Sequence, residues 1–199
     1  MNYYIVVEGE KASIEIYKNW IQFINPSLSY KQQIDEVFEN DFYLIGGYGY
    51  PNYFQVIKDA IIDVNEKDNF DKLVVCIDSE ENSFQEKYDE MDEFIRTNDL
   101  LKGYSIIIQH FCIETWFLGN RKIHSREISN PLLKRYKRLY DVHAEDPEYL
   151  PPNGEEELNR AQFAYKYFRL LLHEKYDRLV YNKHNPSVVI NVNFFNQIK

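Results

Sequence analysis

The chain has 199 residues, of which 44% are hydrophobic, and its formal net charge is −9. This length favours one domain, and the composition excludes collagen-like, disordered and low-complexity proteins. No apolar run approaches the roughly 20 residues that a membrane span needs, the N-terminus lacks a secretory signal, and the two cysteines, Cys76 and Cys112, lie in apolar stretches. We therefore expect a reduced, cytoplasmic protein without a membrane partner.

Predicted strands and helices alternate over the first 120 residues. The apolar residues at 73–77 form an uninterrupted run, which is typical of a central parallel strand covered on both faces. The alternation predicts an α/β, Rossmann-like fold in which helices flank a mostly parallel sheet. The expected strands are 3–7, 42–45, 73–77 and 104–109, and the expected helices are 13–24, 30–39, 51–64, 83–97 and 112–118.

The alternation stops after Gly119, and the rest of the chain is expected to be mainly helical. The pattern predicts a long helix over 155–173, a short strand over 179–181 and a last helix that begins near 185–187 and ends at Phe195. Because no internal repeat is visible, we expect a single domain. It would consist of an α/β core over 1–120 and a basic, mainly helical extension over 121–199 packed on that core.

Basic residues are concentrated between positions 121 and 140, where seven Lys or Arg residues accompany one acid, Glu127. The acidic balance of the whole chain argues against nucleic-acid binding through bulk charge. A local basic segment is either a solvated face or a surface that follows a nucleic-acid backbone. The candidate phosphate contacts are Arg121, Lys122, Lys134, Arg135, Lys137 and Arg138, together with Lys183 near the C-terminus.

Acidic residues follow two of the predicted strands. Glu8 comes directly after the first strand, and Asp78 and Glu80 come after the strand at 73–77. Ligands of an open parallel sheet bind beyond the carboxyl ends of its strands, so the three carboxylates are expected to converge there. They repel one another unless a cation neutralises them, and hard oxygen ligands suit Mg²⁺ or Mn²⁺. The alternative is that these acids only cap the helices that follow.

The same residues carry a family resemblance. The sequence EGEK at 8–11 after a strand, followed by a later apolar strand that ends in Asp78-x-Glu80, resembles the Toprim domain. More narrowly, it is similar to the OLD-like and RloB-like Toprim proteins of bacteria. The family carries a Glu after its first strand and an acidic DxD or DxE triplet after a later one, and Glu8, Asp78 and Glu80 match these positions.

Other segments resemble the same family, and one departs from it. Residues 111–118 (FCIETWFL) resemble its xxFExWLL segment, with Glu114 and Trp116 as the matching residues. The turn at 185–187 (NPS) resembles its terminal NPS/T turn. The RloB-like pattern continues EGEKTE, however, whereas here Ala12 and Ser13 replace the Thr and the second Glu.

The resemblance implies a Toprim-like fold and metal-dependent hydrolysis of phosphodiester bonds in DNA or RNA, in bacterial defence against phage. Glu8 would then transfer protons and also contact the ion, and Asp78 and Glu80 would be metal ligands. Glu114 would hold a second ion or orient the first; the alternative is a capping Glu beside a buried Trp116. Nucleic acid would be the substrate, and an ATPase or other protein encoded nearby would be a partner.

Two other classes of function stay open at this point. In the first, the chain is a catalytically degenerate Toprim-type module that binds metal or nucleotide and recruits a partner protein, which the departure at Ala12 and Ser13 favours. In the second, the chain is an interaction subunit whose exposed Tyr and Phe side chains bury against another protein. The intact Glu8, Asp78 and Glu80 favour the nuclease.

Overall fold

Five strands form a parallel sheet in the computed structural model of the chain, which describes residues 1–177 and 180–198. Strand β1 lies at the centre and pairs in parallel with β3 on one side and β4 on the other. The strand order is β2-β3-β1-β4-β5, which confirms the predicted α/β, Rossmann-like class. The strands are β1 (Tyr3–Val7), β2 (Ser29–Lys31), β3 (Asp41–Gly46), β4 (Lys72–Asp78) and β5 (Gly103–Gln109).

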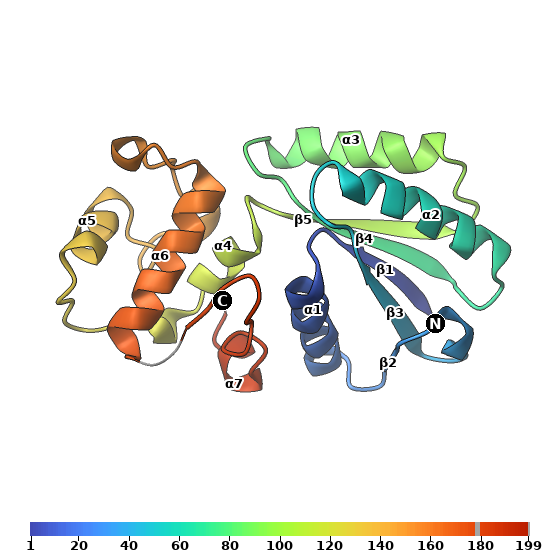
Figure 1. The fold of residues 1–199 in the computed structure, drawn as a ribbon, viewed down its shortest axis with the longest axis horizontal. Helices are drawn as coiled ribbons and strands as arrows, with labels where there is room; N and C mark the ends of the chain where they lie inside the picture. The colour runs from blue at the N-terminus through green and yellow to red at the C-terminus, as the bar shows by residue number, and fades with distance from the viewer. Residues whose placement is uncertain (178–179, 199) are drawn as a thin grey trace. The chain divides into compact units, whose positions relative to one another are not determined.

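Helices cover both faces of this sheet. Helix α1 (Lys11–Ile24) lies on one face, whereas α2 (Asn52–Glu66) and α3 (Phe84–Thr97) lie on the other (Figure 1). The chain therefore leaves β1 toward one face and leaves the neighbouring β4 toward the opposite face. In open α/β sheets such a reversal marks the place where ligands bind, outside the carboxyl ends of the strands.

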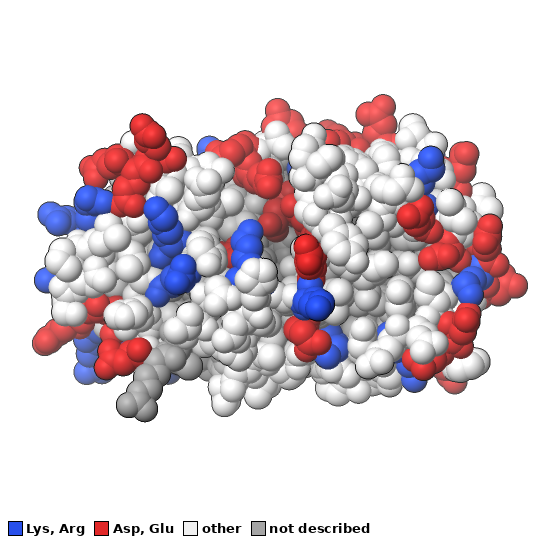
Figure 2. Space-filling view, viewed as in Figure 1, with Lys and Arg blue, Asp and Glu red and all other residues white. Residues whose placement is uncertain are grey.

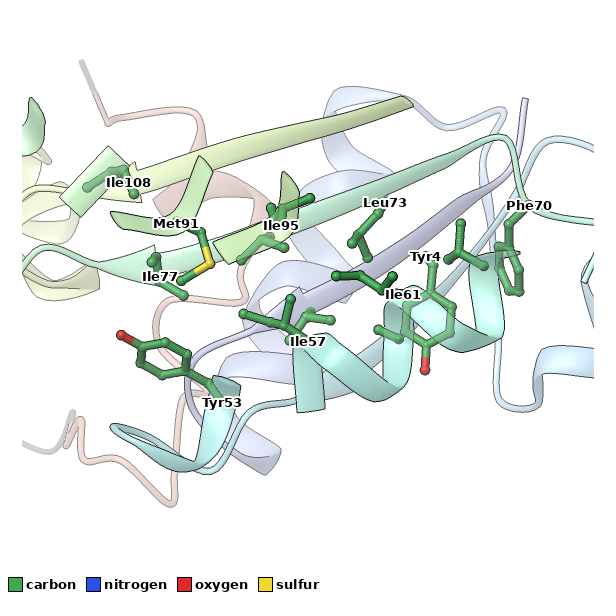
Figure 3. Close-up of a cluster of buried hydrophobic side chains, with 14 of the residues drawn as sticks. Tyr4, Tyr53, Ile57, Ile61, Phe70, Leu73, Ile77, Met91, Ile95 and Ile108 are labelled. Carbon is green, nitrogen blue, oxygen red and sulfur yellow. The ribbon is translucent and has the colours of Figure 1, made fainter. Parts of the chain in front are cut away.

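The main apolar core lies between the sheet and helices α2 and α3 (Figure 3). Burying one Ile or Leu side chain stabilises a fold by about 1.5–3 kcal/mol, so this layer fixes the strands firmly against the two helices. Figure 3 labels the side chains that meet there: Tyr4, Leu73, Ile77 and Ile108 from strands, Tyr53, Ile57 and Ile61 from α2, Met91 and Ile95 from α3, and Phe70 from the loop before β4.

The prediction of a helix over 30–39 is wrong. This stretch contains the edge strand β2 and a single 3-10 turn, η1 (Ile34–Glu36). Distant residues hold its backbone: Asn69 donates its side-chain amide to the carbonyls of Ile34 and Val37, and Asn2 donates to that of Phe38. These long-range hydrogen bonds occupy carbonyl groups that a helix would have used within itself.

The described chain divides into two compact units. The first contains the sheet and comprises Met1–Ile77 and Phe84–Ile108, and the second comprises Asp78–Ser83 and Gln109–Lys199. The sequence predicted that the extension starts at residue 121, whereas the continuous part of the second unit starts at Gln109, and Asp78–Ser83 also belong to this unit. Its helices are α4 (Ile113–Leu118), α5 (Pro131–Leu139), α6 (Arg160–Lys175) and α7 (Val192–Phe195), with 3-10 turns η2 (Arg121–Ile123), η3 (Pro147–Tyr149) and η4 (Gly154–Glu156).

Helix α6 starts later than the expected residue 155. Glu157 adopts a left-handed backbone conformation with φ 53°, which interrupts a helix at that point. Asn159 then caps the helix, because its side chain accepts from the amide of Gln162 while the Gln162 side chain accepts from that of Asn159. This reciprocal capping box sets Arg160 as the first helical residue.

The C-terminal predictions are corrected in a similar way. Asn185 accepts a hydrogen bond from the amide of Ser187, and this local turn replaces the expected helix start. Of the helix expected between 185 and 195, only the short α7, capped by Asn191, is helical. Leu179 of the expected strand lies outside the described residues, and Val180 and Tyr181 do not belong to a strand. No helix in the described ranges is long and apolar enough to cross a membrane.

Candidate functional site

Glu8 follows β1 and its backbone is hydrogen-bonded to strand β4 and to the loop that follows β3. Its amide donates to the carbonyl of Cys76 at 2.9 Å, and its carbonyl accepts from the amide of Gly49 at 2.8 Å. Space around it is restricted, since a Cβ atom on Gly47 would lie 2.6 Å from the Cβ of Tyr53. The loop that follows β3 can therefore approach Glu8 this closely only with glycine at position 47.

Asp78 is the last residue of β4, and Glu80 lies in the loop that follows, which two backbone hydrogen bonds hold. The amide of Ser79 donates to the carbonyl of Gln109 at 2.9 Å, and that of Glu80 donates to the carbonyl of Phe111 at 2.8 Å. Asp78 is half-buried, Ser79 is buried and Glu80 is exposed, with a left-handed φ of 50°. Of the two candidate metal ligands, Glu80 is thus the more open to solvent.

A histidine that the sequence analysis did not select holds the same loop. The Oγ of Ser79 lies 2.7 Å from Nδ1 of His110, within hydrogen-bond distance. Burial lowers the pKa of His110; the nearby Glu148 opposes this shift, and the Arg160 charge adds to it. Ser79 is therefore held by the end of β5 and the residue after it, through its amide to Gln109 and through its hydroxyl to His110.

The sheet register relates the two strand ends that carry the predicted acids. Val7 of β1 pairs with Cys76 of β4, so Glu8 follows one strand just where Asp78 ends its neighbour. The connections from these two strands leave toward opposite faces (Figure 1). The prediction that acids follow neighbouring parallel strands at their carboxyl ends is consistent with this topology.

The donor set suits Mg²⁺ or Mn²⁺ only in an open arrangement. Within residues 1–177 and 180–198, no group of three or more His, Cys, Asp or Glu side chains is arranged to hold a metal ion. Mg²⁺ is commonly bound through one or two carboxylates, with waters and substrate phosphates completing its octahedral shell. Asp78 and Glu80 are hard oxygen donors one residue apart, and they fit a site of that kind and not a closed protein cage.

Glu114 accepts a buried hydrogen bond from another side chain of the second unit. It lies in the first turn of α4, is only 2% exposed, and its Oε1 accepts from the hydroxyl of Tyr181 at 2.9 Å. Burial and the Glu114 charge raise the pKa of Tyr181. Burial also raises the pKa of the Cys112 thiol, and the charges of Glu114 and Asp78 add to that effect. Glu114 therefore lies near the Asp78 loop, but one of its oxygens is already occupied by a phenol.

Three of the predicted phosphate contacts bind groups of the protein itself. Arg121 donates to the carbonyls of Val142 and His143. Arg135 forms ion pairs with Glu155 and Glu156, and Lys137 lies 3.4 Å from a carboxylate oxygen of Asp141. The charges of Arg135 and Lys137 are thus largely balanced by neighbouring acids.

The other four predicted contacts are more open. Lys122, Lys134, Arg138 and Lys183 are exposed, and none of them forms an ion pair with another described residue. On the face shown in Figure 2, Lys and Arg side chains are interspersed with Asp and Glu side chains. Lys134 and Arg138 lie on α5, and with Lys137 they line one hollow of the second unit. Of the predicted phosphate contacts, Lys134 and Arg138 are therefore the best candidates, because both are exposed and neither forms an ion pair with a described residue.

A buried lysine was also missed by the sequence analysis. Lys87 of α3 is 5% exposed and donates to the hydroxyl of Tyr53 at 3.2 Å and to Oε2 of Glu90 at 2.7 Å. Burial raises the pKa of Tyr53 to about 12, Lys87 opposes the shift, and the Glu8 charge contributes to it. A buried cation is therefore linked through Tyr53 to the surroundings of Glu8. No spacing in the sequence distinguishes Lys87 from a surface lysine of an amphipathic helix.

Comparisons of the chain with protein-family models, with curated proteins and with solved structures found no match.

Proposed function

We propose that this chain is a nuclease that hydrolyses phosphodiester bonds of nucleic acid with Mg²⁺ or Mn²⁺. The observation that supports this proposal best is the position of Glu8 and Asp78 at the carboxyl ends of neighbouring parallel strands, where the connections leave toward opposite faces. The resemblance of these positions to the Toprim pattern supports the same chemistry.

Each acid has a separate role in this proposal. Asp78 and Glu80 would hold the ion through their carboxylate oxygens, and Glu8 would accept a proton from the attacking water. A bound divalent ion would orient a phosphate oxygen and stabilise the negative charge that develops during hydrolysis. Ser79 lies between the two ligands, and its hydrogen bond with His110 keeps them in place.

The proposal is tested by cleavage of plasmid DNA and structured RNA in the presence of Mn²⁺ or Mg²⁺. Asp78→Ala should abolish cleavage because it removes a metal ligand, whereas Glu8→Gln should slow it by roughly 10²–10⁴-fold, the usual contribution of a general base. Asp68→Ala is the matched control, since Asp68 is an exposed Asp before the opposite end of β4. It should cleave at the wild-type rate.

The assay needs two safeguards. Melting curves without metal should coincide for the three variants and the wild type, so that loss of cleavage is not loss of folding. The reaction should also be run with any protein encoded nearby, because a partner could be required. If the complete assembly cuts equally well with Asp78→Ala, the proposed site is refuted.

A specific observation favours the second candidate, a binding or regulatory module. The first turn of α1 carries no acid, because Ala12 and Ser13 occupy it, and a metal-holding group of three is absent from the described residues. If the complete assembly cuts neither substrate, but still binds Mn²⁺ in a manner that depends on Asp78, the module is the correct function.

A further inference from the structure

Arg160 lies against the loop that follows β4, within the second unit. It is the first residue of α6, and its backbone amide donates to Oε1 of Glu81 at 2.9 Å. The Cζ atom of its guanidinium lies 4.7 Å from the centre of the Phe111 ring. Phe111 is buried and accepts the backbone hydrogen bond of Glu80, so the same residue supports both the arginine and the acidic loop.

The guanidinium of Arg160 does not use all of its hydrogen-bond donors within the described part of the chain. Its Nε is buried and has no hydrogen-bond partner in the described part of the chain. Its ion pair with Glu81 is 4.0 Å long, beyond hydrogen-bond distance, and the side chain is 36% exposed. A guanidinium offers five N–H donors in a planar fork, and leaving a buried donor unsatisfied costs about 1–3 kcal/mol.

The arginine is nevertheless held in position. The contact with the Phe111 ring restricts where the guanidinium can lie, and the capping box of Asn159 and Gln162 fixes the backbone from which it projects. The N-terminal end of the 16-residue α6 also favours an anion beside Arg160. The guanidinium is held against an aromatic ring, its Nε lacks a partner in the described chain, and Arg160 contacts Glu81 in the loop that follows Asp78 and Glu80. A guanidinium so placed is suited to recognise a phosphate group through two parallel hydrogen bonds.

We propose that Arg160 binds the non-bridging oxygens of the phosphodiester that Asp78 and Glu80 present to the ion. This inference rests on the proposed nuclease function and adds to it the residue that binds the substrate phosphate. Glu81 is 48% exposed, and it accepts from the Arg160 amide but forms only a 4.0 Å ion pair with the guanidinium. Its carboxylate would turn away from the guanidinium as the phosphate binds there. The proposal assigns this contact to α6 and not to the basic segment over 121–140.

The test compares Arg160→Gln with Arg169→Gln. Arg169 is a matched control, because it lies on the same helix, is exposed, and also has its Cζ atom near the centre of an aromatic ring, that of Tyr165 at 5.4 Å. The probes are fluorescently labelled single-stranded DNA and RNA of one sequence. Binding is followed by anisotropy over a salt series, with Ca²⁺ in place of Mg²⁺.

Arg160→Gln should weaken binding by roughly 10- to 100-fold, the range expected for a charged hydrogen bond, and should reduce the salt slope by about 0.7. Arg160→Lys should retain the salt slope but recover only part of the affinity, because lysine keeps the charge and loses the fork. Arg169→Gln should bind as the wild type does. Circular dichroism melting of each variant shows whether the fold is intact, and Arg160→Lys keeps the test valid if the Gln variant unfolds.

The outcomes separate this inference from the nuclease proposal. If Arg160→Gln and Arg160→Lys bind both probes as tightly as the wild type while Asp78→Ala is inactive, the nuclease proposal holds and the role of Arg160 is refuted. If Arg160→Gln loses binding although the wild type cuts nothing, Arg160 binds phosphate and the nuclease proposal is refuted. Absence of wild-type binding to either probe would overturn the role of Arg160.

Discussion

His124 is a half-buried histidine whose surroundings oppose its protonation. Its Nε2 is buried and has no hydrogen-bond partner among residues 1–177 and 180–198, and its ring centre lies 4.7 Å from that of His143. Burial lowers the pKa of His124 to about 4; the nearby His143, Lys137 and Arg121 add to the shift, and Asp141 opposes it. The titration of His124 therefore makes the stability of this protein depend on pH.

We expect the free energy of unfolding to fall as the pH drops from about 6.5 toward 4. His124 binds a proton below about 6.5 in the unfolded chain but only near pH 4 in the folded one, so the unfolded chain binds more protons between these values. The stabilisation that comes from the neutral His124 is fully present above about pH 6.5. By pH 5 the free energy of unfolding would have fallen by about 2 kcal/mol. Urea denaturation at pH 7 and pH 5 measures it.

The control for this prediction is a second histidine substitution. His124→Gln should show a smaller loss of stability between the two pH values than the wild type. His184→Gln, at an exposed turn residue, should lose as much as the wild type. Equal pH dependence in His124→Gln and the wild type would contradict the assignment.

At the scale of an element, α5 is a basic helix whose charges are not equivalent. The Asn130 side chain caps it by accepting from the amides of Leu132 and Leu133, and its first residue is Pro131. These features match the ordinary start of a helix. The four basic residues divide into two pairs. Arg135 and Lys137 contact acids, whereas Lys134 and Arg138 are exposed and form no ion pair with a described residue.

If α5 follows a nucleic-acid backbone, its exposed pair should carry most of the salt dependence. Replacing Lys134, Arg135, Lys137 and Arg138 with Ala should flatten the decrease in affinity with salt, since each phosphate contact to a single strand contributes about 0.7 to the slope. The Lys134→Ala, Arg138→Ala double variant should show most of this effect. Anisotropy titrations over a KCl series measure it.

The Arg135→Ala, Lys137→Ala double variant is the matched comparison on the same helix. It should change the slope less, because the charges that it removes are already paired with Glu155, Glu156 and Asp141. An unchanged slope in the quadruple variant would show that the segment is only a solvated face.

For the whole molecule, the proposed ion should act as a ligand of the folded state. A ligand that binds only the folded protein at ten times its Kd adds about 1.4 kcal/mol of stability, which is roughly 3–6 °C in melting temperature at this size. We expect millimolar Mn²⁺ or Mg²⁺ to raise the melting temperature of the wild type by that amount. Differential scanning fluorimetry measures the shift.

The same measurement on variants locates the ion. Asp78→Ala should lose the shift, whereas the control Asp68→Ala should keep it. A shift that survives in Asp78→Ala would place the ion elsewhere, and a wild-type melting curve unmoved by both ions would remove the metal site from the proposal.

The sequence by itself determined the α/β class and most strand and helix positions. Apolar runs such as 73–77 and helical spacing such as that of Ile57, Ile61 and Val64 are local patterns, and burial on one or both faces acts on them directly. The positions of Glu8 and Asp78 at strand ends followed from the same patterns, because acids that interrupt apolar runs mark where the strands end.

Only the tertiary structure decided the features that depend on distant residues. Residues 30–39 do not form the expected helix, because the side chains of Asn2 and Asn69 donate hydrogen bonds to their carbonyls. Lys87 is buried and donates a hydrogen bond to Tyr53. Arg160 lies 49 residues after Phe111 and 79 residues after Glu81, and no local pattern relates these residues. Periodicity reports which face of an element is buried, whereas the partner of a polar side chain is set by the chain's long-range path, which the sequence pattern does not encode.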